Sequence, residues 1–171
     1  MEIELQQVVD SLNLKFEGNL GNIEESYGMT TLQVRKASIF EVIEYLKKEQ
    51  SFTLLTDICG MHFPDNEEEM QFAVVYHIHN LFKNIRLRLR VFLPAGNPEV
   101  DSMVALFSSA NWQERETYDF FGIKFKNHPN LVRILNMDEM EAFPLRKEFP
   151  LEDAGRVDKD DRFFGRTIHN E

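Results

Sequence analysis

The spacing of apolar residues predicts two helices in the first part of the chain. The first is indicated by apolar positions three and four residues apart, at Ile3, Leu5, Val8, Val9 and Leu12. The second, at residues 39–49, has an apolar stripe formed by Ile39, Val42, Ile43 and Leu46. Ser38 and Glu41 have the spacing of a capping box, which satisfies backbone N–H groups at a helix start. The pattern therefore predicts a helix that begins directly after Ser38.

Five strands are predicted around the second helix. Two short ones flank Gly28 and form a hairpin, at residues 22–27 and 31–35. Three longer ones follow, at residues 52–58, 72–79 and 85–91. The run at 52–58 is largely apolar, which is typical of a strand at the centre of a sheet. We therefore expect it to have neighbours on both sides.

The last of these strands alternates between apolar and basic residues. Ile85, Leu87, Leu89 and Val91 face one side of the sheet, and Arg86, Arg88 and Arg90 face the other. On a chain with a net charge of −10, a basic stripe is a local reversal of sign. It is either a solvated sheet face or a contact for an acidic protein partner or a phosphate.

Helical signals return in the second half of the chain. They predict a helix at residues 99–107 and another that begins at Asn111, has Glu114 in a variant of the capping box, and ends at Gly122. The order αββαβββα indicates an α+β fold with a mainly antiparallel sheet packed by helices. Beyond it, residues 136–171 show no helical or strand period. We expect an α+β domain at residues 1–135 and an extended C-terminal tail at 136–171 that docks on a partner.

Composition excludes several classes of function. The acidic balance disfavours nucleic-acid binding. The single cysteine, Cys59, excludes an internal disulfide and a CxxC metal clip, and it is expected to be a buried structural thiol. No apolar run approaches the roughly 18–20 residues that span a bilayer, so direct membrane insertion is not expected.

Two groups of residues are candidates for a catalytic or metal-binding site. His77 and His79 form an H-x-H pair, but no third ligand stands at a recognisable spacing, so no metal is expected. The acidic side chains at 114–119 with Arg115 suit either general acid–base chemistry or buried ion pairs where two subunits meet. Since no nucleophile elbow, phosphate loop or catalytic triad accompanies them, ion pairs are the favoured interpretation.

Residues 114–135 read E-R-E-x-x-D-F-F-G-I-x-F-x-x-H-P-x-L-x-R-I-L. This motif closely resembles the signature of the 30 kDa subunit (the C subunit) of NADH-quinone oxidoreductase, respiratory complex I. Ala110-Asn111-Trp112 before the motif and Pro144-Leu145-Arg146-Lys147 after it also match. One position departs from the family pattern: the family usually has two arginines before Ile-Leu, and here Val132 replaces the first.

The resemblance implies a non-catalytic, hydrophilic scaffold subunit of the peripheral arm of a proton-translocating NADH:quinone oxidoreductase. Such a subunit packs against the forty-nine-kilodalton subunit, which helps form the quinone cavity, and against other peripheral-arm subunits, on the cytoplasmic side of the inner membrane. It carries no cofactor of its own. FMN and iron–sulfur clusters belong to its partners, and quinone is reached only through them. The lone cysteine agrees, because one thiol cannot hold a cluster.

The motif residues, together with the aromatic pair of the tail, give the expected interface. They are Glu114, Arg115, Glu116, Asp119, Phe121, His128, Pro129, Arg133, Arg146, Phe163 and Phe164. Two alternatives stay open. One is the equivalent subunit of a related membrane-bound hydrogenase or of a quinone reductase with another electron donor. The other is a free-standing small hydrolase that uses the carboxylates of residues 114–119.

Overall fold

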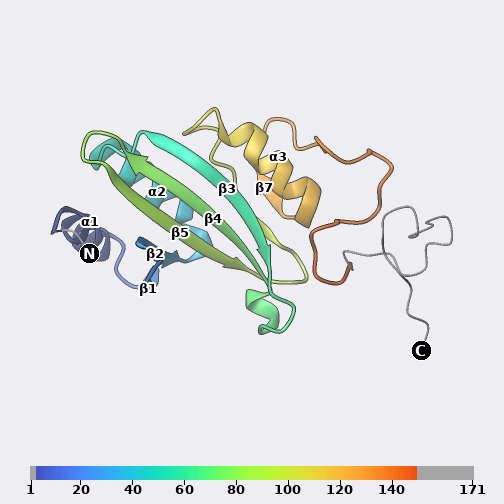
Figure 1. The fold of residues 1–171 in the computed structure, drawn as a ribbon, viewed down its shortest axis with the longest axis horizontal. Coiled ribbons are helices and arrows are strands. Elements are labelled where there is room, and N and C mark those ends of the chain that lie inside the picture. Colours follow the sequence, from blue (N-terminus) through green and yellow to red (C-terminus); the bar gives the residue numbers. More distant parts are fainter. Residues whose placement is uncertain (1–2, 150–171) are drawn as a thin grey trace, which may run out of the picture.

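The computed structural model describes residues 3–149, which build one five-stranded sheet with helices on one face and at one edge (Figure 1). The strand order across the sheet is β1 (Leu20–Ser26), β2 (Met29–Val34), β5 (Ile85–Leu93), β4 (Phe72–Asn80) and β3 (Leu54–His62). Every pair of neighbours is antiparallel except β2 and β5, which run parallel. The predicted α+β class with a mainly antiparallel sheet is confirmed.

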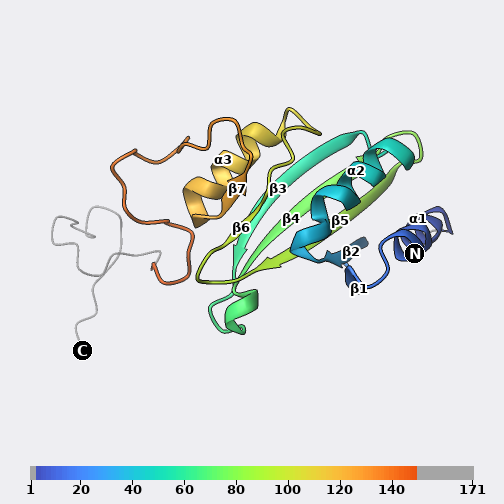
Figure 2. The ribbon, with the colours of Figure 1, turned by 180° about the vertical axis from the view of Figure 1, so that it is seen from behind.

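Two helices cover one face of the sheet. They are α1 (Ile3–Lys15) and α2 (Ile39–Glu49), and α2 lies in front of the sheet when the molecule is seen from behind (Figure 2). Leu12, Ile43 and Leu46 are fully buried in the same apolar cluster as Leu87 and Leu89 of β5. Each such side chain contributes about 1.5–3 kcal/mol by leaving water. The apolar side of β5 therefore holds the core, as the alternation predicts.

The helix predicted at residues 39–49 is confirmed, but its capping box is not formed. A single turn of 3₁₀ helix, Lys36–Ser38, leads into α2, and the Ser38 side chain makes no capping hydrogen bond. Ser38 has a φ of −113° and a ψ of −1°. A capping residue normally has an extended backbone, which aims its oxygen at the free N–H groups. The preceding turn removes that geometry.

The prediction that residues 52–58 form a central strand is wrong, because β3 is the last strand of the sheet. Its outer edge is covered instead by α3 (Ala110–Phe121). Gln113 Nε2 donates to the carbonyl of Thr56 at 3.2 Å, and Thr117 Oγ1 donates to that of Ile58 at 3.3 Å. An unprotected edge strand invites pairing with other chains. Here α3 covers part of the outer edge of β3 and satisfies two of its carbonyl groups, while Leu54 and Met61 stay exposed.

A helix at residues 99–107 is also not found. A short strand, β6 (Glu99–Asp101), pairs in parallel with β7 (Lys124–Lys126), and turns follow it. Val100 and Phe125 are buried on this two-stranded sheet. Val100, one of the apolar residues that suggested a helix, is thus buried beside a strand far away in the sequence, which no local pattern shows.

The segment after β7 has no regular helix or strand, as predicted, up to the end of the described residues. Residues 127–149 run along the outer side of α3 (Figure 1). None of the helices in residues 3–149 has both the length and the apolar character required to cross a bilayer. Phe163 and Phe164 lie outside the described residues, and the predicted domain boundary at residue 135 stays a prediction.

Candidate functional site

The candidate site consists of α3, the strand beneath it and the segment at residues 127–149. A glycine allows the helix to approach the strand. A Cβ atom placed on Gly60 of β3 would lie 2.6 Å from Cδ2 of Phe121 and 3.0 Å from Cγ2 of Thr117. An isolated glycine inside a strand often marks such a close approach, so the sequence does carry a signal for this contact.

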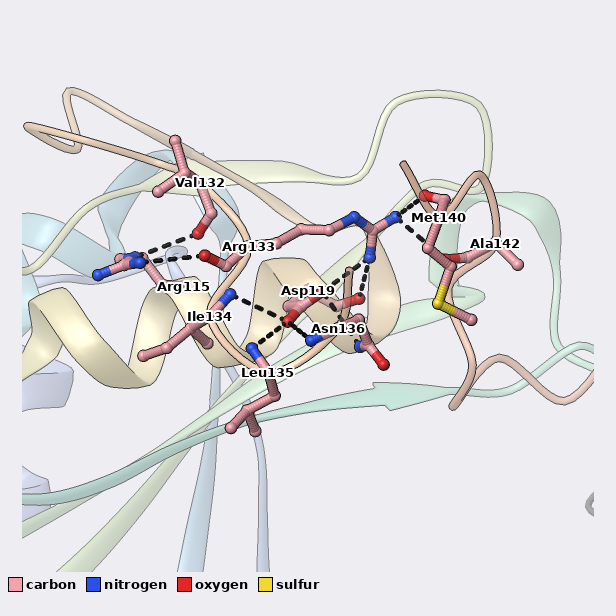
Figure 3. Close-up of polar contacts among 9 residues, drawn as sticks. All are labelled: Arg115, Asp119, Val132, Arg133, Ile134, Leu135, Asn136, Met140 and Ala142. Carbon is pink, nitrogen blue, oxygen red and sulfur yellow. Dashed lines mark hydrogen bonds and ion pairs between the residues drawn. The ribbon is translucent and has the colours of Figure 1, made fainter. Parts of the chain in front are cut away.

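Asp119 is the centre of the site (Figure 3). It is fully buried, and its Oδ2 accepts hydrogen bonds from the backbone N–H groups of Ile134, Leu135 and Asn136, at 3.1, 2.8 and 2.9 Å. Its Oδ1 accepts from Asn136 Nδ2 at 3.1 Å and from Arg133 Nη1 at 2.7 Å. Three consecutive N–H groups that converge on one oxygen form an anion nest, here filled by the protein's own carboxylate.

Arg133 completes this arrangement from the other side. Besides the Asp119 carboxylate, its Nη1 donates to the Asp119 carbonyl at 3.0 Å. Its Nη2 donates to the carbonyls of Met140 and Ala142, at 2.6 and 3.1 Å, and the guanidinium lies over the ring of Phe143. One side chain therefore holds two turns of an otherwise irregular segment against the last turn of α3. Val132, the departure from the family pattern, is exposed beside it.

The pKa of Asp119 is held well below its usual range. Burial by itself disfavours the carboxylate, but the N–H groups of Asn136, Leu135 and Ile134 and the Arg133 guanidinium more than offset that cost. The group is thus ionised at any physiological pH. It has no lone pair aimed at a substrate, which argues against a catalytic base at this position.

The other charged residues of α3 only partly follow the prediction that they are buried and paired. Arg115 makes no ion pair within residues 3–149: its Nε and Nη2 donate to the carbonyls of Val132 and Arg133, at 3.1 and 3.0 Å, and it stacks on Trp112. Glu116 is exposed and has no ion pair within residues 3–149, so its expected pairing against a neighbouring subunit stays a prediction. Glu116 lies one helical turn after Trp112, on the outer face of α3. The adjacent face of the helix packs on β3.

Glu114 is fully buried, yet its partners are neutral. Its Oε2 accepts from the Ser102 hydroxyl and its Oε1 from the Met103 N–H, both at 2.6 Å. No ion pair joins Glu114 to a cation within residues 3–149. Burial raises its pKa to about 7, against the lowering effect of these two hydrogen bonds. The sequence suggested a capping role, whereas the side chain instead ties α3 to the turn after β6.

The C-terminal end of α3 is covered by residues 143–146. Gly122 ends the helix with a φ of 72°, as predicted, and a Cβ there would lie 2.6 Å from Arg146 Nη2 and from Phe143 Cε2. Arg146 Nε donates to the carbonyl of Phe121 at 2.7 Å, and the N–H of Leu145 to that of Phe120 at 3.2 Å. A cation at this end also suits the helix dipole.

Two histidines fasten the rest of the segment. His128 Nε2 lies 3.1 Å from the carbonyl of Asn111, and its Nδ1 accepts from the N–H of Asn130 at 3.0 Å. This pair of partners requires the neutral ring with its proton on Nε2. His62 of β3 accepts from the N–H of Lys147 at 3.0 Å. The His62 contact joins residues 85 positions apart and left no signal in the sequence.

Three side chains of metal-ligand type meet on β3 and β4, namely Asp57, Cys59 and His77. Burial and the neighbouring Asp57 raise the pKa of the Cys59 thiol to about 12, which disfavours the thiolate that a metal would need. Burial and the Arg88 guanidinium lower the pKa of His77. A cation here would meet the positive charge of Arg88, so the chemistry of this trio does not favour a metal.

Comparison with known proteins places the chain in a family. The family model described as "Respiratory-chain NADH dehydrogenase, 30 Kd subunit" matches residues 32–155. The C subunit of NADH-quinone oxidoreductase from Citrifermentans bemidjiense is 39% identical over 153 residues, covering 90% of this chain and 94% of that protein. The corresponding protein of Geobacter metallireducens is 35% identical over the same shares of both chains.

Solved structures agree with this assignment. The trypsin-resistant fragment (1-134) of Nqo5 is 31% identical and superposes with a TM-score of 0.66, covering 75% of this chain and all of that one. A chain of the membrane-bound sulfane sulfur reductase, an archaeal respiratory membrane complex, has a TM-score of 0.74 at 17% identity, which shows the shared fold alone. The chain therefore belongs to the family of the 30 Kd subunit of the respiratory-chain NADH dehydrogenase.

Proposed function

We propose that this chain is a non-catalytic scaffold subunit of the peripheral arm of an NADH:quinone oxidoreductase. Its site supports electron transfer from NADH to quinone by holding a neighbouring subunit in place. Family membership supports the assembly. One observation carries the scaffold role: the polar atoms of Asp119 and Arg133 bind groups of the same chain. These two side chains therefore shape a surface and are not available for catalysis.

The surface they shape carries several exposed apolar side chains. Six of the large hydrophobic side chains that are exposed in residues 3–149 lie on α3 or on the segment around it: Trp112, Val132, Leu135, Met137, Leu145 and Phe149. Leu135 and Met137 are 65% and 73% exposed. Apolar side chains that gather on one part of a surface indicate a site of protein contact. The segment at residues 127–149 contains no helix or strand whose geometry would force these apolar side chains onto the surface.

The expected interface residues then divide into two roles. Glu114 and Asp119 are buried, so they act on the surface from beneath, Asp119 together with Arg133. Arg115 and Arg146 are half-buried and hold the backbone of the segment. Glu116 and Pro129 are exposed, and Phe121 and His128 are half-buried. The exposed members, with the apolar side chains above, are the ones available to a partner.

The partner that fits this proposal is the forty-nine-kilodalton subunit that helps form the quinone cavity, called the quinone-cavity subunit below. Other peripheral-arm subunits join it on the cytoplasmic side of the inner membrane. FMN, iron–sulfur clusters and quinone then belong to those partners. Residues 136–171 form the docking tail in this proposal, with Phe163 and Phe164 as anchors beyond the described residues. Each aromatic anchor would contribute about 1.5–3 kcal/mol by burial.

Two alternatives differ from this proposal in testable ways. The chain could serve a related membrane-bound hydrogenase or a quinone reductase with another electron donor, in which case the partners that oxidise NADH would be missing. A free-standing hydrolase would need an available carboxylate at residues 114–119. Asp119 is fully engaged and Glu114 is buried, which argues against that function.

Affinity purification of the tagged full chain from its native membrane tests the proposal. We expect it to bring down the quinone-cavity subunit together with NADH:quinone reductase activity. Leu135→Glu should lower the yield of that complex, because it places a charge on the apolar surface without touching the core. Leu14→Glu is the matched control, since Leu14 is 87% exposed on α1, on a different part of the molecule.

Mass spectrometry of the purified material decides between the alternatives. A quinone-cavity subunit without any NADH-oxidising partner would favour the complexes with another electron donor. A chain that purifies alone at full yield would contradict the scaffold role. Equal losses for Leu135→Glu and Leu14→Glu would show that the surface around α3 is not the contact.

A further inference from the structure

The face of the sheet opposite α1 and α2 carries no helix within the described residues (Figure 1). Its central strand, β5, presents Arg86, Arg88 and Arg90 there, and the neighbouring β4 presents His77 and His79, which lie directly opposite Arg88 and Arg86 in the sheet. An antiparallel sheet often has one solvated face. This face differs from a solvated one in how its charged groups are partnered.

The three arginines are unequally satisfied. Arg90 Nη2 binds Glu24 Oε1 at 2.8 Å, while Arg88 Nη2 donates to the thioether sulfur of Met29 at 3.2 Å. Arg86 is exposed and takes part in none of the hydrogen bonds or ion pairs found among residues 3–149. A thioether is a weak acceptor, so Arg88 lacks, among the described residues, the anionic partner that a half-buried guanidinium normally has.

Three buried polar atoms on the same face also lack hydrogen-bond partners among the described residues. Nε of Arg88, Nε of Arg90 and Nδ1 of His77 are shielded from solvent, and none has a hydrogen-bond partner within residues 3–149. A buried donor without an acceptor is costly, more so when it is charged. A carboxylate is the preferred acceptor of a guanidinium, and it could reach the exposed Arg86 and the accessible part of the half-buried Arg88, rather than the shielded Nε atoms.

A hollow of about 470 Å³ lies beside these groups. Its lining includes apolar side chains, such as Met29 and Leu54. Its charged and polar lining comes from Thr56, Asp57, His77, His79 and Arg86. Asp57 is the only acidic side chain in that lining. The hollow therefore suits a side chain that is acidic at its tip and enters between apolar walls.

We propose that this open face is a second docking surface, distinct from the one around α3, and that it takes an acidic segment of a neighbouring chain. Aspartate or glutamate side chains of that segment bind Arg86 and Arg88. We infer an acidic occupant from charge complementarity, because this face is basic although the net charge of the chain is −10. Nucleic acid and anionic lipid are less suited, since the rest of this acidic chain would repel a long polyanion or a charged membrane.

The inference rests on the proposed function only in that the chain has neighbours in an assembly. Carbodiimide coupling in the assembled complex tests it. Arg86→Lys keeps the charge and introduces an amine, which the reagent joins directly to a carboxylate in contact. We expect a product between position 86 and an aspartate or glutamate of another chain, absent from the wild-type complex, which has no amine there.

Charge reversal gives a second readout. Arg86→Glu and Arg88→Glu should each lower the yield of the complex at moderate salt by roughly tenfold or more, since like charges at a contact oppose association strongly. Lys48→Glu on α2 is the control: it also reverses an exposed cation, but on the opposite face, where it pairs with Glu44 of the same helix. Its yield should be unchanged.

Three outcomes would overturn the inference. In the first, position 86 couples only within this chain, for example to Asp57. In the second, Arg86→Glu and Lys48→Glu behave alike. In the third, the purified chain binds phosphatidylglycerol vesicles through Arg86 while no protein product forms, which would assign the face to lipid. A complex that assembles normally without the product defeats this inference alone, whereas a chain that never co-purifies defeats the proposed function.

Discussion

Asp119 and Arg133 form an ion pair of 2.7 Å, with side chains that are 0% and 9% exposed, and it joins the last turn of α3 to the segment after β7. The backbone between residues 133 and 142 is held by this pair and by the groups that each member binds. The pair thus converts an irregular segment into a defined surface. The ion pair fixes the shape of this surface as well as stabilising the fold.

Removing one member of this pair should be strongly destabilising. Asp119→Ala removes the anionic partner of the Arg133 guanidinium and the acceptor of three N–H groups, and breaking a buried pair costs about 3–5 kcal/mol. Urea unfolding should show the loss, and hydrogen exchange should show faster exchange at residues 134–136. Glu116→Ala on the outer face of the same helix is the control and should change little. Equal unfolding midpoints for the two variants would contradict the role of the pair.

The raised pKa of the buried Glu114 leads us to predict an unusual dependence of folding stability on pH. Its pKa in the folded chain is raised to about 7, so the folded state binds a proton that the unfolded state has released. The stabilising contribution is fully present below the unfolded pKa of about 4.3 and is lost as pH rises through 7. Since each unit of pKa difference corresponds to about 1.4 kcal/mol, the loss is on the order of 4 kcal/mol.

Glu114→Gln isolates this effect. The amide keeps a hydrogen-bonding oxygen for the Met103 N–H and can donate to the Ser102 hydroxyl, but it does not titrate. We expect the variant to be more stable than wild type at pH 8 and to lack the decline between pH 5 and 8 in denaturant unfolding. Parallel stability curves for the two proteins would show that Glu114 is not the group responsible.

We predict that the segment around Lys147 is released from His62 in mild acid. Burial lowers the pKa of His62, so its neutral form, which accepts the Lys147 N–H, is favoured on folding. This contribution is present above the unfolded pKa of about 6.5 and is lost as pH falls towards the lower folded value. Hydrogen exchange at residues 146–149, corrected for intrinsic rates, should therefore rise below pH 6.

A matched variant separates this contact from general acid effects. His62→Asn places an acceptor oxygen near the position of Nδ1 and does not titrate in this range. It should keep residues 146–149 protected at both pH values. If acid exposes these residues equally in wild type and variant, the His62 contact does not control them.

Gly60 should tolerate no side chain. In Gly60→Ala the new methyl group would lie 2.6 Å from Phe121 Cδ2, so either the Phe121 ring or α3 itself must shift away from β3. Overpacking of this kind costs about 1–3 kcal/mol. Gly96→Ala is the control, because nothing lies within 4 Å of a Cβ placed there and its φ is ordinary. A Gly60→Ala protein as stable as Gly96→Ala would show that the helix is not closely packed on the strand.

Local patterns in the sequence determined much of this fold. The 3.6-residue period of α2, the alternation of β5 and the glycine that ends α3 each act within a few residues, and the structure confirms all three. The motif at residues 114–135 likewise identified the family, because a long ungapped pattern is specific without any structure. Asp119 and Arg133 were both among the expected interface residues, although nothing in the spacing paired them.

Only the tertiary structure decided the rest, because the deciding contacts join residues far apart in the chain. The edge position of β3 depends on α3, which covers its outer side. Residues 99–101 around Val100 form a strand because β7 lies alongside. Glu114 binds the turn after β6 and not its own helix start, so its pKa is set by burial. Periodicity reports which face of an element is apolar, while the neighbour that buries that face is chosen by the packing of the whole chain.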